Sequence, residues 1–301
     1  MRRLSFVLLA AAVAFALAQS GRSAEPQPSV ALLAIGDFGV AGSRERNLGV
    51  AMRRFEGQND TDALVTLGDN DYTESPAAFR AAWAQSFGWL RPAGVAVAGS
   101  LGNHDVRVQR GRYQFATLSM PGPYYRRKFG DVELFVLDSN NVNAAQTSWL
   151  ERALASSNAL WKVAVLHHPA FTWGSYRSHP DVVRRWVPLF ERYGVRLALS
   201  GHDHNYQRFA PRRGVTYVVH GGGAGAFYPV TGCPKSYPRR VRARREHGWL
   251  YLVFTDDRMV GWTVNMSGRR TDRFTVLPRT ARPSHAGRSR QTAHVLDTGS
   301  A

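Results

Sequence analysis

The stretch Ala31-Leu32-Leu33-Ala34-Ile35-Gly36-Asp37 decides the fold class, and Ala63-Leu64-Val65-Thr66-Leu67-Gly68-Asp69 repeats its pattern. Each is a short apolar run that ends in glycine and aspartate, which is typical of a fully buried strand in an α/β sheet. Ligands of such sheets bind beyond the carboxyl ends of the strands. We therefore expect Asp37 and Asp69 to leave one edge of a sheet, where their carboxylates can converge.

Four further short segments carry carboxylate, amide or imidazole groups, and most of them follow apolar runs. They are Gly102-Asn103-His104-Asp105, Asp138-Ser139-Asn140, His167-His168-Pro169 and Gly201-His202-Asp203-His204. An extended backbone would point the imidazoles of His202 and His204 to one side, because alternate residues share a face. Oxygen and nitrogen donors of this kind suit divalent or trivalent metals. The pattern predicts a hydrolase with two metal ions.

Each of these signals is weak when it is taken alone. Gly-Asp turns are common, and a histidine such as His104 or His204 can be an ordinary loop residue. Tyr72 can be a packed aromatic, and His220 is expected to end a strand rather than to line a pocket. The metal hypothesis depends on the ordered set of segments.

The start of the chain has the pattern of a secretory signal peptide over residues 1–24. Met1-Arg2-Arg3 is basic, and the apolar run from Leu4 to Leu17 precedes small residues that suit cleavage. An uncleaved N-terminal anchor is the competing interpretation. We predict an exported protein, periplasmic or secreted, without a stable membrane span after cleavage.

The chain has 301 residues, is 44% hydrophobic and carries a net charge of +17, most of it arginine. This charge would attract small anionic substrates and polyanions. The densest basic cluster, Arg239–Arg245, lacks interleaved aromatic residues, so we expect a solvated basic loop with no specific nucleic-acid partner. Cys233 is the only cysteine, which excludes an intramolecular disulfide.

Periodicity predicts one compact domain over residues 29–277, with two packed sheets, and a disordered basic tail over 278–301. Expected helices begin after a Ser43 cap and at Ser75-Pro76, and two more cover 144–155 and 181–193. Expected strands, besides the two opening runs, cover 94–98, 132–137, 162–166, 195–199, 214–220, 248–255, 259–265 and 271–277.

The ordered motifs GD-x-G, GDN-x-Y, GNHD, H-x-P and GHDH resemble those of the calcineurin-like metallophosphoesterase superfamily. Within it they are most similar to the small, tartrate-resistant type of purple acid phosphatase. Two positions carry that finer resemblance: Tyr72, and Gly39, where most other superfamily members have histidine. The resemblance implies a four-layer α/β/β/α sandwich with two mixed sheets.

The resemblance also implies roles for individual residues. A ferric ion would bind Asp37, Tyr72 and His204, and Asp69 would bridge two metals. Asn103, His167 and His202 would hold the second ion, Fe(II), Zn(II) or Mn(II). His104 would neutralise phosphoryl charge or protonate the leaving alkoxide, His179 is the candidate second proton donor, and His168 would support the ligands.

The activity implied is that of an acid phosphatase-like phosphoric ester hydrolase, in which metal-activated water attacks a phosphomonoester. Two alternatives stay open: a phosphodiesterase of the same superfamily, and a non-catalytic polyanion-binding protein.

Overall fold

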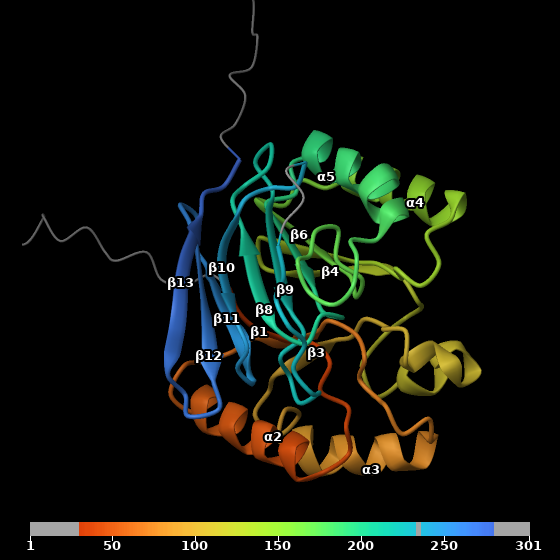
Figure 1. Ribbon diagram of the computed structural model, residues 1–301, viewed down its shortest axis with the longest axis vertical. Helices are drawn as coiled ribbons and strands as arrows, with labels where there is room; N and C mark the ends of the chain where they lie inside the picture. The colour runs from red at the N-terminus through yellow and green to blue at the C-terminus, as the bar shows by residue number, and fades with distance from the viewer. Residues whose placement is uncertain (1–29, 233–235, 280–301) are drawn as a thin grey trace, which may run out of the picture.

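The computed structural model describes residues 30–232 and 236–279. Two β-sheets face each other, with helices α2 and α3 along one outer side and α4 and α5 along the opposite side (Figure 1). This confirms the predicted four-layer α/β/β/α arrangement. The signal peptide, Cys233 and nearly all of the expected tail lie outside the described residues.

The first sheet has six strands in the order β13-β12-β11-β1-β2-β3. β1 lies at its centre, parallel to β2 and antiparallel to β11, and every residue of β1 is buried. The strands are β1 (Val30–Ile35), β2 (Ala63–Thr66), β3 (Ala96–Ala98), β11 (Gly248–Phe254), β12 (Met259–Asn265) and β13 (Arg270–Val276).

The second sheet has seven strands in the order β10-β8-β9-β7-β6-β5-β4. Its central strands β5, β6, β7 and β9 run parallel, while β4, β8 and β10 pair antiparallel at the two sides. The strands are β4 (Tyr125–Phe129), β5 (Val132–Val136), β6 (Trp161–Val165), β7 (Leu197–Ser200), β8 (Tyr206–Phe209), β9 (Thr216–His220) and β10 (Arg240–Arg244).

In the part of the chain that the structure describes, four α-helices cover the sheets: α2 (Ser43–Glu56), α3 (Pro76–Phe87), α4 (Ala144–Ala155) and α5 (Val187–Tyr193). α3 begins as predicted, because the Ser75 hydroxyl accepts the amide hydrogen of Ala78 at 3.3 Å and Pro76 occupies the first turn. Ser43 is the first residue of α2 rather than its cap, and Gly42 takes the cap position. The segment before α5, Val182–Trp186, is π-helical.

Three apolar layers hold the sandwich together. The inner layer joins the two sheets through residues such as Leu32, Val65, Leu134 and Leu252. The two outer layers pack α4 and α5 on the second sheet and α2 and α3 on the first. β1 is buried on both faces, which explains why the sequence Ala31–Ile35 is continuously apolar.

Three strands, β4, β8 and β10, were not predicted. For the basic cluster Arg239–Arg245 the prediction of a loop was wrong. Arg240–Arg244 is strand β10, not a solvated loop; it pairs with β8 along the side of the second sheet. Arg242 contacts Asp272 at 3.4 Å, so part of its charge is compensated. β9 does end at His220, as expected.

Within the described ranges no helix combines the length and apolarity that a bilayer crossing requires.

Candidate metal centre

The predicted metal ligands all lie at the carboxyl ends of strands, where the two sheets meet. Asp37 follows β1, Asp69 follows β2, and Asn103 lies beyond β3 in the first sheet. From the second sheet, His167 follows β6, and the loop after β7 supplies His202 and His204. The site therefore draws its side chains from both halves of the sandwich.

One group of donor atoms gathers around Tyr72. Its hydroxyl oxygen lies 3.4 Å from Asp37 Oδ1 and 3.1 Å from His204 Nε2. Asp37 Oδ1 and His204 Nε2 are 3.3 Å apart, so the three donors form a compact triangle. Metal–ligand distances for oxygen and nitrogen are about 2.0–2.2 Å, which places neighbouring ligands roughly 3 Å from each other. The triangle has the dimensions of one side of a metal coordination shell.

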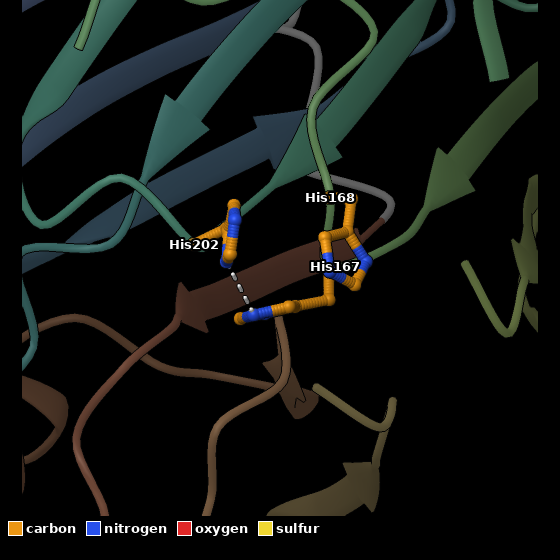
Figure 2. Close-up of side chains that lie close together, drawn as sticks. All are labelled: His167, His168 and His202. Carbon is orange, nitrogen blue, oxygen red and sulfur yellow. Dashed lines mark hydrogen bonds between the residues drawn. The ribbon is translucent and has the colours of Figure 1, made fainter. Parts of the chain in front are cut away.

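A second group gathers around His167. Its Nε2 lies 3.0 Å from Asn103 Oδ1 and 3.2 Å from His202 Nδ1. Figure 2 shows the contact between the two rings as a dashed line, with each ring on the loop that follows its strand. This group has the same spacing as the first.

Asp69 lies close to donor atoms of both groups. Its Oδ1 is 3.5 Å from His167 Nε2, and it accepts the backbone amide hydrogen of His104 at 2.9 Å. One ligand atom each from Asp37, Asp69 and His167 lie within 4.8 Å of one another. A carboxylate in this position can reach cations in both groups.

The hydrogen bonds of the imidazoles fit cation binding. His167 Nδ1 lies 2.8 Å from the carbonyl oxygen of Leu67, and His204 Nδ1 lies 2.7 Å from that of Ala226. A carbonyl only accepts, so each Nδ1 carries the hydrogen and each Nε2 of the neutral ring presents a lone pair. The lone pair of His167 faces Asn103 Oδ1 and that of His204 faces Asp37 Oδ1, an arrangement that a cation stabilises.

The directions in which the pKa values of the three rings shift agree with this. Burial lowers the pKa of His167, but Asp69 and Asp37 more than offset it, so the net shift is upward. The pKa of His204 is likewise raised, against the effect of burial, by its contact with Asp37. The surroundings of both rings thus favour positive charge. Burial and the neighbouring imidazoles lower the pKa of His202, which keeps that ring neutral and able to ligate.

Tyr72 behaves in the opposite sense. Burial, and then the charges of Asp37 and Asp69, raise the pKa of its hydroxyl far above 10. Its phenolate therefore forms only if a highly charged cation offsets both effects. The main chain at Tyr72 is held by a hydrogen bond from its amide to the carbonyl oxygen of Gly39 at 2.9 Å. No side chain fits at Gly39, because its Cβ would lie 2.0 Å from the carbonyl oxygen of Asn70.

Three of the predicted ligands have a left-handed backbone. The φ angles are 60° at Asp37, 52° at Asp69 and 70° at His202. Such conformations cost about 1–3 kcal/mol each in non-glycine residues and collect at functional sites. The sharp turns they make redirect each side chain from the strand end into the shared centre.

Asp105 is a structural part of the site. It belongs to the segment Gly102-Asn103-His104-Asp105, but no role was predicted for it from the sequence. Its buried carboxylate accepts hydrogen bonds from the backbone amides of Asn70, Asp71 and Gly102 and from the side chains of Asn70 and Gln114. It thereby fixes the loop of Asp69 against the loop of Asn103. Its place beside His104 in the GNHD motif was the available signal.

The proposed proton donors lie outside the two groups. The ring of His104 packs on that of Tyr72, with centroids 4.4 Å apart, and burial lowers its pKa. His179 contacts the ring of His168 at 5.3 Å, and the His168 ring is 4.5 Å from that of His202. His179 is thus one ring further from the donors than His168. Burial lowers the pKa of His168 to about 2, so this ring is neutral.

The segment Asp138-Ser139-Asn140 supports the site. The Ser139 hydroxyl lies 2.9 Å from His168 Nδ1, and the Asn140 amide donates to the carbonyl oxygen of Leu101. These contacts position the loops that carry His167 and Asn103.

Comparisons with known proteins agree with the family that the motifs resemble. The family model described as calcineurin-like phosphoesterase matches residues 30–206. The human "Tartrate-resistant acid phosphatase type 5" is 25% identical over 85% of this chain and 93% of its own length. The Arabidopsis thaliana "Purple acid phosphatase 7" is 25% identical over 66% of this chain and 71% of its own.

Two solved structures share the fold. Purple acid phosphatase PPD1 from yellow lupin superposes with a TM-score of 0.66 and 18% identity, over 84% of this chain and 55% of the lupin chain. GAP50, described as the anchor in the inner membrane complex of Plasmodium, has a TM-score of 0.68 and 15% identity, over 83% and 89%. At these identities the two structures speak for the fold only.

The match to the family model, over residues 30–206, spans more than half of the chain and includes every predicted metal ligand. The chain belongs to the calcineurin-like phosphoesterase family and is a metal-dependent phosphoric ester hydrolase.

Proposed function

We propose that this protein is an exported phosphomonoesterase of the acid phosphatase type that works with two metal ions. Asp37, Tyr72 and His204 would hold Fe(III), and Asp69 would bridge to a second ion, Fe(II), Zn(II) or Mn(II). Asn103, His167 and His202 would complete the second site. The observation that carries this proposal is the convergence of two groups of donor atoms, one of which contains a tyrosine oxygen.

Two cations at these positions would lower the pKa of a water molecule and neutralise charge on phosphoryl oxygens. The chain's own contribution is to fix the donors: backbone carbonyls set the tautomers of His167 and His204, and Asp105 locks two of the ligand loops together. Burial lowers the pKa of His104, and its side chain is only partly buried. It can take up a proton from solvent and deliver it to a leaving alkoxide.

The bridging carboxylate gives the most direct test. Asp69→Asn should lose both turnover and full metal occupancy, since it removes the negative charge that would hold two cations close together. Elemental analysis and hydrolysis of an aryl phosphomonoester measure the two effects. Asp256→Asn, an exposed carboxylate between β11 and β12 and far from the donor groups in the chain, is the control. Wild-type metal content and turnover in Asp69→Asn would contradict the assignment.

A phosphodiesterase of the same family is the second candidate, because the donor set defines a phosphate site without defining the leaving-group pocket. Comparing an aryl monoester with the corresponding diester separates the two activities. A polyanion-binding protein without catalysis is disfavoured by the buried carboxylates Asp37 and Asp69, which repel anions when no cation is present.

Export rests on the signal-peptide pattern of residues 1–24. We expect a mature N-terminus after Ala18-Gln19-Ser20 or Arg22-Ser23-Ala24 and recovery in the periplasm or medium. N-terminal sequencing of the mature protein measures both points. A retained, uncleaved start would identify the segment as an anchor instead.

A further inference from the structure

His168 lies beside the metal centre, but neither donor group uses its ring. One ring nitrogen of each of His167, His168 and His202 lies within 4.8 Å of the other two, and Figure 2 shows the three rings together. By distance alone, His168 could be a further ligand of the second metal ion. Its hydrogen bonds argue against ligation and indicate a different role.

The register of the second sheet brings Ser139 next to His168. β5 and β6 are parallel and pair Val136 with Val165, and Ser139 and His168 each follow three residues later. The Ser139 hydroxyl oxygen accepts the backbone amide hydrogen of His168 at 2.9 Å and lies 2.9 Å from its Nδ1. The buried side chain of Gln146 makes three hydrogen bonds to the backbone around Ser139, so this loop is held in place.

The Ser139 hydroxyl determines which nitrogen of His168 carries the hydrogen. Ser139 is fully buried, and among the described residues its hydroxyl oxygen has hydrogen-bonding partners on His168 alone. Because the oxygen accepts the amide hydrogen, the acceptor left for its own hydrogen is Nδ1. A buried hydroxyl hydrogen is rarely left unpaired, so Nδ1 accepts it and the neutral ring carries its hydrogen on Nε2.

This tautomer is the reverse of that in two of the ligand rings. His167 and His204 keep the hydrogen on Nδ1 and offer the lone pair of Nε2 to a cation. The Nε2 atom of His168 carries a hydrogen instead and has no lone pair for a metal. The two nitrogens of an imidazole point in nearly opposite directions, so Nε2 is turned away from Ser139. It is the atom available to a group bound beside His202, whose ring centroid is 4.5 Å from that of His168.

We propose that His168 is a hydrogen-bond donor to the substrate, whose Nε2–H binds an oxygen of a phosphate group held at the second donor group. Ser139 is the positioning residue that keeps the hydrogen on Nε2. This inference rests on the proposed function, because it takes the bound group to be a phosphate. A hydrogen bond to an anionic oxygen is stronger than one between neutral groups. The ring transfers no proton, which distinguishes its role from that proposed for His104.

Long-range ¹H–¹⁵N NMR of the zinc-loaded protein, labelled at histidine, measures the tautomer directly. We expect His168 to carry its hydrogen on Nε2 in the wild type and to populate the Nδ1–H form in Ser139→Ala, which lacks the hydroxyl donor. The variant His168→Gln identifies the signal. A wild-type ring with hydrogen on Nδ1, or an Nε2 atom bound to zinc, would overturn the proposal. An unchanged tautomer in Ser139→Ala would refute the positioning role.

Calorimetry with inorganic phosphate tests the contact on the zinc-loaded protein without turnover. The amide nitrogen of glutamine can take the place of Nε2, whereas the shorter side chain of asparagine ends near the position of Nδ1. We expect His168→Asn to weaken phosphate binding about 10- to 100-fold, the usual size of a hydrogen bond to a charged group. His168→Gln should keep most of the affinity, and both variants should keep the wild-type zinc content. Equal affinity in His168→Asn and wild type, or loss of zinc from both variants, would contradict the proposal.

These measurements separate the inference from the proposed function. If the protein hydrolyses no phosphomonoester but binds phosphate with the expected order of variants, the role of His168 stands and the proposed activity fails. If it hydrolyses a monoester while His168→Asn binds phosphate like the wild type, the activity stands and the role of His168 fails.

Discussion

Tyr72 is the residue on which the identity of the first metal depends. Burial and the charges of Asp37 and Asp69 strongly disfavour its phenolate, whereas Fe(III) would stabilise it and give a visible charge-transfer band. Tyr72→Phe keeps the ring packed on His104 but removes the oxygen. We expect an oxidised wild-type protein that is purple to pink and a variant that is folded and colourless.

A visible spectrum with iron analysis checks this prediction. Tyr113→Phe is the matched control, because its hydroxyl bonds to Asp71 at 2.6 Å and belongs to neither donor group. Persistence of the band in iron-loaded Tyr72→Phe would make the tyrosine a packed aromatic only. A colourless wild-type protein filled with zinc or manganese would place it outside the purple type.

His104 should affect turnover more than metal binding. It touches the centre through its ring on Tyr72 and its backbone amide on Asp69, and both donor groups are complete without its imidazole. We expect His104→Ala to lower kcat by ~10²–10⁴-fold, the usual range for general acid–base catalysis, with near-normal metal content. Metal loss of the same extent would make His104 a ligand. His179→Ala in the same assay tests the second proton donor.

At the scale of elements, the loop after β1 depends on a glycine that the motif GD-x-G marks. Gly39→Ala forces a Cβ into the Asn70 carbonyl and should destabilise the protein by about 1–3 kcal/mol, since this close contact is between backbones. Denaturant unfolding measures it. Gly122→Ala, whose Cβ has open space to 3.9 Å, should be near neutral. Equal effects of the two changes would show that the close approach is easily relieved.

The start of α2 contains a buried acid with a predicted effect on pH stability. The Glu45 carboxylate accepts the amide of Ala41 at 2.8 Å, and burial raises its pKa from 4.5 to about 7. The folded protein then binds the extra proton between these values, so Glu45 makes stability fall as pH rises from about 4.5 to 7. The total is at most about 3 kcal/mol. Glu45→Gln should flatten this slope in unfolding measured at several pH values; an unaltered slope would place its origin elsewhere.

Sequence reasoning located elements well wherever burial set the residue pattern. α4 and β12 have the predicted bounds, and β1 and β2 coincide with the two apolar runs that end before Gly36 and Gly68. It failed at β10, because the outward charges of an edge strand hide its alternation, and the pairing with β8 is a tertiary fact. The same limit applies to the site: motifs named the donors, but only the folded chain brings Tyr176 and Tyr228, which belong to no motif, onto their rings.

At the scale of the whole molecule, the metal centre connects the two sheets. Asp37 and Asp69 extend from the first, and His167, His202 and His204 from the second. Cations bound to both should stabilise the sandwich, by about 2.7 kcal/mol at a hundredfold excess over Kd. We expect chelation to lower Tm by roughly 5–10 °C. Calorimetry with and without chelator measures the shift, which should shrink in Asp69→Asn; an equal shift in that variant would point to binding elsewhere.

The same placement has a consequence for how the protein matures. The amide of His202 and the carboxylate of Asp37, which meet at 2.8 Å, are 165 positions apart in the chain, so the donors come together only after both sheets have docked. Metal binding at both donor groups would then follow the docking of the sheets. A chain exported unfolded would have to collect its ions at its destination, and the ions available in that compartment, rather than those in the cytoplasm, would determine which metal fills the second site.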